Sequence, residues 1–505
     1  MSGIIQKVAE INGAVNSVVW GVPMLILIIG TGIYLTARTG FFHLVNAKLI
    51  HKKTIGAALT KDSSVKKSGE HTAISQFQAL STALAGTIGT GNIAGVASAI
   101  AVGGAGAVFW MWVSAFFGMM THFSENVLGI YYRRRNDKNE WSGGAMYYIQ
   151  NGFAQKGGFL AKIGKPLAYL FSFLTVFASF GIGNMSQVNS MAEAMKDAFN
   201  IPTVVTGIVV AVVVALVTLG GIQRLGQTAE KIVPFMAVAY IAASIAVLIT
   251  NFKMIPTVFG SIFTEAFGVK AFAGGVAGVT VREAMTMGFK RGVFSNEAGL
   301  GSSVMVNSAS DVKEPVEQGM WGVFEVFFDT IVVCSFTAFT VLSSGVLGTT
   351  DANGELIEGV SLVSLAFSTT FRSFAGKILS IAVLLFAFTT VLGWSFYGSK
   401  ALEYIAGRKA SVVYKVAFIV FIVIGSTMKL ELAWNISDTL NGMMAIPNLI
   451  GLLVLSNTVV AITRNYVVRK IKKTDPDIEP MLSAYDDIQA AQLAALRAEE
   501  AEQKN

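Results

Sequence analysis

Long apolar stretches recur along almost the whole chain and constrain its fold more than any other feature. A helix that spans a bilayer needs about 20 mostly apolar residues, and stretches of that kind follow one another from residue 18 to residue 462. Hydrophobic residues make up 53% of the 505 residues and charged residues only 14%, which is far from the balance of a soluble domain. The sequence therefore predicts an all-α polytopic membrane protein.

Eleven candidate transmembrane helices emerge when the apolar runs are separated at helix-breaking and charged residues. The first has neither the basic leader nor the small-residue cleavage site of a signal peptide, so we expect it to remain as a helix. The candidate helices cover residues 18–37, 73–103, 106–131, 166–195, 202–220, 231–250, 271–300, 317–347, 375–397, 412–428 and 439–462.

Positive charge is divided unevenly between alternate connections of these helices. Of the 38 Lys and Arg residues, 30 lie in one alternate set, namely 38–70, 132–165, 221–231, 290–313, 398–415 and the tail. The other set holds seven. Because cytoplasmic loops near span ends are enriched in Lys and Arg, we expect the N-terminus outside and the C-terminus in the cytoplasm. The residues behind the net charge of +7 then lie mostly at the cytoplasmic side, where they contact lipid, and no nucleic-acid partner is expected.

Residues that carry enzymatic or metal chemistry are sparse. The single cysteine, Cys334, lies inside an apolar run, where a small buried hydrophobic role is the expected one. His122, Glu125 and Asn126 share a helical face and form the only cluster that resembles a metal-ligand set. An intramembrane enzyme would need a nucleophile with its base, a metal set or paired carboxylates. We therefore expect neither an enzyme nor a cofactor.

Residues 85–95, which we call the first break, interrupt the second candidate helix. The run Ala85-Gly-Thr-Ile-Gly-Thr-Gly-Asn-Ile-Ala-Gly95 combines glycines with threonines and an asparagine. Close helix packing through Gly86, Gly89 and Gly91 is one explanation, but Thr90 and Asn92 are not needed for packing. The alternative is an unwound segment in the middle of the membrane.

An unwound segment at that depth implies a cavity, because each unsatisfied peptide group in hydrocarbon costs several kcal/mol. Its free N–H groups and positive helix N-terminus suit a carboxylate, while its freed carbonyls and threonine hydroxyls suit a hard cation such as sodium. The first break therefore has the chemistry to hold an amino acid and an ion together.

Residues 292–303, which we call the second break, interrupt the chain in or just after the seventh candidate helix. If the first helix is set aside, helices two to six and seven to eleven form two sets of five, and each set begins with an interrupted helix. An odd number of spans forces the two sets into opposite orientations, which is the inverted-repeat plan with its site at the midplane. We expect an N-terminal helix with a basic cytoplasmic connection (1–72), two five-helix repeats (73–250 and 251–463) and a cytoplasmic tail (464–505).

Further polar residues inside the candidate helices are less specific. Asn184 and Gln187 lie one turn apart in the fourth helix and are able to face the cavity, and Thr389 and Thr390 precede Trp394 in the ninth. Threonines in membrane helices often bond to their own backbone and tryptophans often lie at the interface, so the pattern leaves packing and function open. Glu325 and Asp329 share a face, and we expect a paired structural bridge rather than an ion relay.

A resemblance to a known family rests on several of these segments. The run Gly103-Gly-Ala-Gly-Ala-Val-Phe-Trp-Met-Trp-Val-Ser-Ala-Phe-Phe-Gly118 resembles the signature of the alanine or glycine:cation symporter family, the sodium:alanine symporters. The segments Gly89-Thr-Gly-Asn92 and Ser295-Asn-Glu-Ala-Gly299 also resemble that family, and the similarity runs from about residue 15 to 465. The resemblance implies eleven helices in a leucine-transporter-type 5+5 inverted repeat with one extra N-terminal helix.

The resemblance also implies a set of site residues. Sodium would be bound by the backbone of Gly86 and Ile88 together with Thr389 and Thr390. The substrate carboxylate would lie on backbone amides around Gly89 to Gly91. The full set expected to bind substrate is Gly89, Thr90, Gly91, Asn92, Gln187, Ser295, Asn296 and Trp394.

These expectations combine into sodium-coupled symport of small neutral amino acids, alanine or glycine, across a bacterial inner membrane by alternating access. A bulky Trp394 over the site would crowd out branched side chains. A channel is disfavoured, since two broken helices in unlike halves suit an occluding site better than a continuous pore. Proton coupling remains the closer rival, although threonines favour sodium because they carry no titratable charge near neutral pH.

Overall fold

The structure, a computed structural model, describes residues 2–60, 64–70, 72–268, 280–428 and 431–502, and most of them are helical. The α-helices are α1 (Ser2–Val19), α2 (Val22–Arg38), α3 (Phe42–Val45), α4 (Ala47–Lys53), α5 (Ile55–Ala58), α6 (Gln76–Thr87), α7 (Val96–Gly103), α8 (Gly106–Tyr131), α9 (Ala145–Lys156), α10 (Gly158–Phe180), α11 (Ser186–Phe199), α12 (Thr203–Thr218), α13 (Gly221–Thr250), α14 (Ile255–Ala266), α15 (Val281–Asn296), α16 (Val304–Asn307), α17 (Pro315–Val326), α18 (Ser335–Ser343), α19 (Gly359–Phe371), α20 (Ala375–Thr427), α21 (Glu431–Val454), α22 (Ser456–Tyr466) and α23 (Asp486–Glu502).

Shorter elements link these helices. Strands β1 (Arg134–Arg135) and β2 (Trp141–Ser142) pair antiparallel in the connection after α8. Wider π-helical turns lie within long helical stretches, at Gly91–Gly95, Gly181–Met185, Phe327–Cys334 and Val467–Ile471. Such turns shift the side-chain register and are frequent at functional sites.

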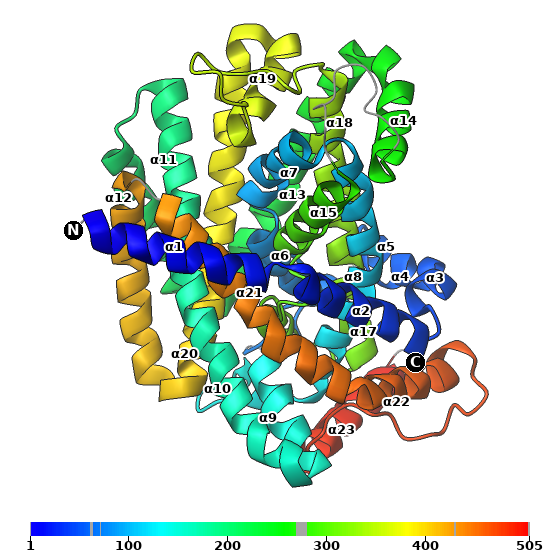
Figure 1. Cartoon of the computed structure of the whole chain (residues 1–505). Helices are drawn as coiled ribbons and strands as arrows, with labels where there is room; N and C mark the ends of the chain where they lie inside the picture. Colours follow the sequence, from blue (N-terminus) through cyan, green and yellow to red (C-terminus); the bar gives the residue numbers. More distant parts are fainter. Residues whose placement is uncertain (1, 61–63, 71, 269–279, 429–430, 503–505) are drawn as a thin grey trace.

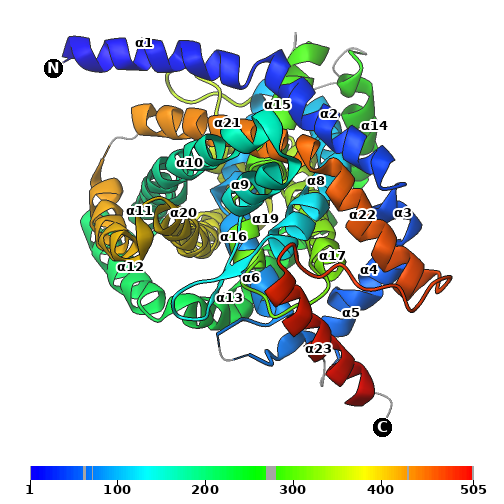
Figure 2. The ribbon, with the colours of Figure 1, turned by 90° about the horizontal axis from the view of Figure 1, so that it is seen from below.

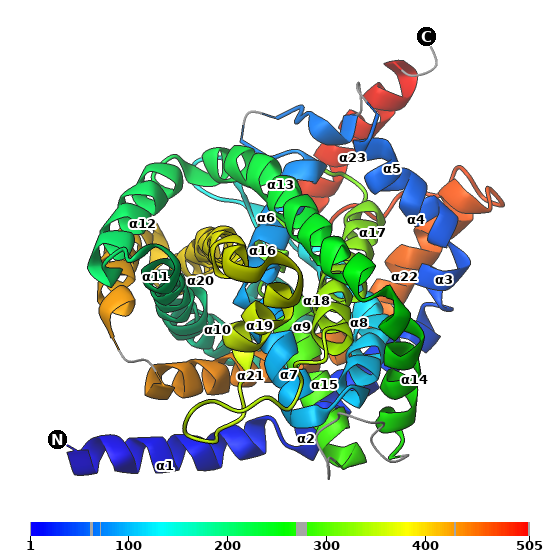
Figure 3. The ribbon, with the colours of Figure 1, turned by 90° about the horizontal axis from the view of Figure 1, so that it is seen from above.

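The helices form an inner group and an outer ring. Views along the bundle from either end show α12 and α13 curving around α11 and α20, with α6 and α16 near the middle (Figures 2 and 3). Every residue from 79 to 93 is buried, whereas α12 exposes large apolar side chains such as Val209 and Leu216. Apolar side chains on the rim suit lipid contact, so the first break lies in the protein interior.

Among the described residues, length and composition single out six helical stretches that suit a membrane span, or up to eight if each sharply bent pair counts as one. The bent pairs are α6 with the segment Gly91–Gly103, at 55°, and Asn435–Val454 with Ser456–Ile471, at 58°. The span expected at 106–131 agrees with α8, which has the same bounds. The first residues of the span expected at 271–300 lie outside the described residues.

Two expected connections are largely helical. Residues 221–231 form the start of α13, and residues 398–415 belong to α20, in which two helices meet at a kink at Gly407. Charged and polar side chains in both segments lower hydropathy, and in α20 the helical backbone is broken at Gly407. A further helix, α1, precedes the span expected at 18–37, which corresponds mainly to α2.

Elements at the two ends of the bundle differ in character. Helices α9 and α23 lie at one end and α14 and α19 at the opposite end, while α1 and α2 run along one side (Figure 1). The tail packs onto the connection after α8, where Ala484 N–H donates to the Tyr131 carbonyl at 2.9 Å and Arg134 lies over the Tyr485 ring at 3.9 Å. The tail is therefore a docked part of this end.

Candidate functional site

The first break is an unwound turn closed by its own polar side chains. Helix α6 ends at Thr87, and Ile88 has extended backbone angles. The Gly89 N–H donates to Asn92 Oδ1 at 2.9 Å, and a π-helical turn follows at Gly91–Gly95. The predicted interruption is confirmed, and its glycines also pack closely, because a Cβ at Gly89 would overlap Thr390 Oγ1.

The second break follows α15 directly. That helix ends at Asn296, and Glu297 adopts a left-handed conformation with φ 57°. The chain remains non-helical until α16, and the Gly299 N–H donates to Glu125 Oε1 at 3.1 Å. The predicted interruption is again confirmed, with its unwound part at residues 297–303.

One carboxyl group connects the two breaks. Asp329 lies in the π-helical turn Phe327–Cys334 between α17 and α18. Its Oδ1 accepts a hydrogen bond from Asn92 Nδ2 at 2.7 Å, and its Oδ2 accepts one from Ser295 Oγ at 2.8 Å. The Thr330 hydroxyl donates to the same Oδ2 at 2.9 Å. All of these side chains are buried, so the contacts hold the two breaks in a fixed relation.

On the other side of the first break, polar groups of α11 and α20 approach it. Gln187 Oε1 accepts from Thr90 Oγ1 at 3.1 Å and from the Thr90 N–H at 3.4 Å. The Thr390 hydroxyl lies 3.4 Å from the Ile88 carbonyl oxygen. These contacts bring oxygen atoms from three helical elements around one unwound turn.

A small cavity of about 20 Å³ lies between these groups. A volume of that size accommodates about one water molecule. Its walls mix polar and apolar groups. The lining residues are Gly86, Thr87, Gly89, Gly91, Ile182, Gln187, Phe294, Glu297, Thr390, Trp394 and Asn441.

Most of the residues expected at the site gather at or next to this cavity. Ile88, Thr90, Asn92 and Ser295 belong to the breaks themselves and make the bonds given above. Asn296 Nδ2 donates to Thr330 Oγ1 at 3.0 Å. Among the expected residues, those that line the cavity itself are Gly86, Gly89, Gly91, Gln187, Thr390 and Trp394.

Two expected side chains point elsewhere. The Thr389 hydroxyl donates to the Phe386 carbonyl of its own helix at 2.9 Å and lies 3.5 Å from the Met236 sulfur. Asn184 donates to the Phe418 carbonyl at 2.7 Å, so it joins α20 and does not line the cavity. Asn184 and Gln187 are one helical turn apart in sequence, which suggested that both face the cavity. The π-helical turn Gly181–Met185 shifts the side-chain register between them, so the two side chains point in different directions.

The expected bridge between Glu325 and Asp329 was wrong. Glu325 Oε2 lies 3.0 Å from His122 Nε2, and His122 Nδ1 lies 2.8 Å from Glu125 Oε2. Asn448 donates to Glu125 at 2.5 Å and to the Gly299 carbonyl at 2.9 Å. This buried network ties α8, α17 and α21 to the second break. No group of three His, Cys, Asp or Glu side chains suited to a metal ion occurs among the residues that the structure describes.

Six residues at the site were not among the expected site residues. Asp329 joins the two breaks, and the other five line the cavity, namely Thr87, Ile182, Phe294, Glu297 and Asn441. Glu297 stands directly after Ser295 and Asn296, so its place in the break was a usable signal. Asp329 and Asn441 had no such signal, because they come from elements far along the chain.

The chain is similar to known proteins in sequence and in fold. The sequence profile of the sodium:alanine symporter family matches residues 5–480. The chain is 45% identical over 464 residues to the sodium/alanine symporter AgcS of Methanococcus maripaludis, which covers 91% of this chain and 97% of that relative.

Two solved structures share the fold. A Na⁺-coupled sialic acid symporter in its substrate-bound outward-open state matches with a TM-score of 0.53, covering 95% of this chain and 96% of that one. MhsT in complex with L-phenylalanine matches with a TM-score of 0.52, covering 78% of this chain and 99% of that one. Sequence identity is 12% in both cases, so these matches concern the fold alone.

Proposed function

This chain belongs to the sodium:alanine symporter family, and we propose that it carries small neutral amino acids, alanine and glycine, into the cell together with sodium. Members of this family are secondary transporters rather than enzymes, and the chain is a multi-pass membrane protein. The observation that carries the proposal is the small cavity where the two breaks meet, which residues of both breaks line.

The proposed architecture is eleven transmembrane helices, with one helix (1–72 with its connection) before two inverted repeats of five (73–250 and 251–463) and a tail (464–505). Each proposed repeat begins with an interrupted helix, and this supports the division. The kink of α20 at Gly407 supports two spans within that element. Alternating access would then move one group of helices against the other around the fixed site.

The proposed substrate site comprises Gly89, Thr90, Gly91, Asn92, Gln187, Ser295, Asn296 and Trp394. The N–H groups of Gly89 and Thr90 already point at side-chain oxygens of Asn92 and Gln187. A substrate carboxylate offers the same acceptor chemistry, with a full charge that makes the hydrogen bonds stronger. A substrate carboxylate can therefore replace the Asn92 and Gln187 oxygens as the acceptor of these two hydrogen bonds.

A small side chain is proposed because the walls of the cavity leave little room. Trp394 is 3% exposed, and its side chain lies so close to Gly183 that a Cβ there would overlap it. The indole therefore cannot retreat toward the π-helical turn Gly181–Met185. Alanine and glycine require the least displacement of these walls.

The proposed sodium site comprises the backbone of Gly86 and Ile88 with Thr389 and Thr390, and the Thr389 hydroxyl would have to turn away from the Phe386 carbonyl to take part. The approach of the Thr390 hydroxyl to the Ile88 carbonyl supports it, because hard cations prefer oxygen ligands. Proton coupling is the second candidate. The buried carboxyl groups of Glu297 and Asp329 beside the cavity and the breaks are the observation that favours it.

The binding of alanine at several sodium concentrations tests the proposal. Purified protein should bind alanine more tightly as sodium replaces potassium, since coupled ligands raise each other's affinity. Thr390→Val keeps the side-chain shape and removes the hydroxyl near Ile88, so a higher sodium concentration should be needed. Thr390→Ser, which keeps the hydroxyl, is the matched control. Equal alanine affinity in sodium and potassium, with a dependence on pH instead, would favour proton coupling.

A further inference from the structure

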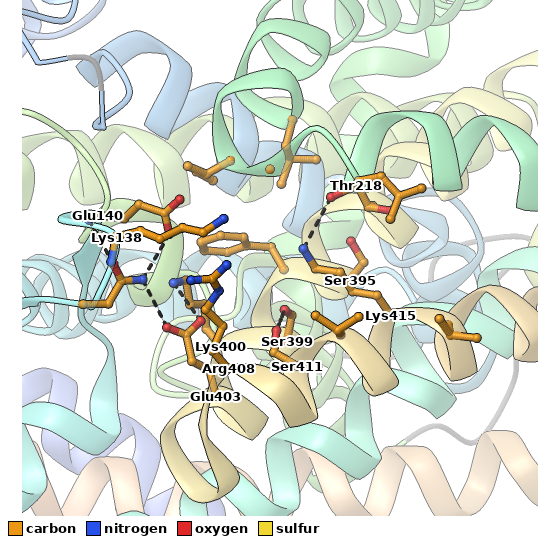
Figure 4. Close-up of a pocket in the computed structure, with 18 of the residues that line it drawn as sticks. Lys138, Glu140, Thr218, Ser395, Ser399, Lys400, Glu403, Arg408, Ser411 and Lys415 are labelled. Atoms are coloured by element: carbon orange, nitrogen blue, oxygen red, sulfur yellow. Dashed lines mark hydrogen bonds and ion pairs between the residues drawn. The ribbon is translucent and has the colours of Figure 1, made fainter.

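A second, larger pocket lies at the end of the bundle that carries α9. Its volume is about 300 Å³. The connection after α8, the turn between α12 and α13, and α20 on both sides of its kink contribute the walls (Figure 4). No residue lines both this pocket and the cavity at the two breaks, so the pocket is a separate site.

Positive charge predominates in this pocket. Lys138, Lys400, Arg408 and Lys415 line it together with two carboxyl groups, Glu140 and Glu403. Both carboxyl groups already have partners, since Asn136 Nδ2 donates to Glu140 at 3.0 Å and to Glu403 at 3.2 Å. Lys400 Nζ also pairs with Glu403 at 3.0 Å.

Two of the cations have unused binding capacity. The side chains of Lys138 and Arg408 have no hydrogen-bond or ion-pair partner among the described residues, and both are exposed. Lys415 contributes a single 3.5 Å contact with the Thr218 carbonyl. The pocket can therefore bind an anion without breaking an existing ion pair.

The rim of the same pocket is apolar and exposed. Leu219 is 70% exposed, Val412 is 58% exposed and Val416 is 60% exposed, and all three line the pocket. On helices of a membrane protein such side chains suit contact with lipid chains. A ligand that fits the whole pocket needs an anionic head and an apolar tail.

We propose that this pocket binds an anionic phospholipid, with its phosphate among Lys138, Arg408 and Lys415 and its acyl chains against Val412 and Val416. Basic pockets between helices at the cytoplasmic side recognise such headgroups. A soluble anion would use the cations alone and would leave the apolar rim in contact with water. Since the pocket is lined by α20 on both sides of the kink at Gly407, a bound lipid would join the two halves of that helix to the connection after α8.

The test uses the full-length protein in a neutral detergent. Thermal unfolding is followed while phosphatidylglycerol, phosphatidylcholine or inorganic phosphate is added. Phosphatidylglycerol should stabilise the protein at lower concentrations than phosphatidylcholine does. Each Lys or Arg that pairs with the headgroup in the pocket is expected to contribute about fivefold to affinity for anionic lipid. The double variant Lys138→Gln with Arg408→Gln should therefore need about 30 times more phosphatidylglycerol.

A matched double variant makes the result specific. Lys156→Gln with Lys409→Gln removes the same charge from exposed positions outside the pocket, and it should respond to phosphatidylglycerol as the unmodified protein does. If the Lys138 and Arg408 double variant does not fold, Lys138→Gln alone should still need about five times more of this lipid. An unchanged response of the pocket variants would overturn the proposal. So would equal stabilisation by inorganic phosphate, because the ligand would then be a soluble anion.

Discussion

Asp329 lies where the two interrupted helices approach each other, and its carboxyl group contacts a side chain from each. Hydrogen bonds to a carboxylate contribute about 1.5–3 kcal/mol each. Asp329→Asn replaces one acceptor oxygen by a donor, so it disrupts at least one of these contacts while keeping the side-chain shape. We expect the initial rate of alanine uptake to fall about 10-fold or more.

Uptake into cells, corrected for the amount of protein in the membrane, measures this effect. Asp351→Asn is the control, because Asp351 is exposed in the loop before α19 and should leave uptake unchanged. An Asp329→Asn variant that transports at the normal rate would contradict the role given to this residue.

The residues of the two breaks were predictable because glycine, threonine and asparagine next to one another weaken a membrane helix wherever they occur. Asp329 was not, because its contact with Asn92 joins positions 237 residues apart. Because Asp329 shares a helical face with Glu325, the sequence indicated only that these two side chains could contact each other. The direction of each side chain depended on the π-helical turn Phe327–Cys334, which hydropathy does not reveal.

At the scale of elements, the kink in α20 depends on one glycine. Gly407 has φ 77° and ψ 176°, a conformation that is essentially confined to glycine and costs other residues about 1–3 kcal/mol. Gly407→Ala should therefore lower the free energy of unfolding by about that amount. Thermal unfolding of the purified protein measures the loss.

Gly376→Ala is the matched control for that variant. Gly376 lies in the regular part of the same helix, and a Cβ there would meet no atom within 4 Å. Alanine has the higher helix propensity, so this change should be neutral or slightly stabilising. Equal unfolding temperatures for the two variants would contradict the account of the kink.

The helical content of the membrane-spanning elements could be predicted since about 20 apolar residues have few other solutions in a bilayer. The limits of α13 and α20 could not, because hydropathy reports where a helix leaves the lipid and not where its hydrogen bonds stop. The short α9 and the hairpin β1–β2 were not expected, because they depend on tertiary contacts at the end of the bundle.

At the scale of the whole molecule, the distribution of Lys and Arg predicts the orientation in the membrane. The only cysteine, Cys334, is buried, so an added cysteine can be labelled against a low background. In intact cells, a membrane-impermeant maleimide should label Asn353→Cys, in the loop before α19. Lys409→Cys, next to the kink of α20, should react only after the membrane is opened.

The unmodified protein, with Cys334 alone, controls for background labelling. The opposite pattern, with Lys409→Cys labelled in intact cells, would reverse the proposed orientation. Labelling of both positions from the same side would contradict the number of spans proposed between them.

Sodium coupling is tested by alanine uptake into liposomes that contain the purified protein, driven by an inward sodium gradient or by an equal potassium gradient. We expect saturable, concentrative uptake only with sodium, and a marked loss in Thr390→Val but not in Thr390→Ser. Equal uptake with potassium that follows an imposed pH gradient would contradict sodium coupling and assign the transporter to proton symport.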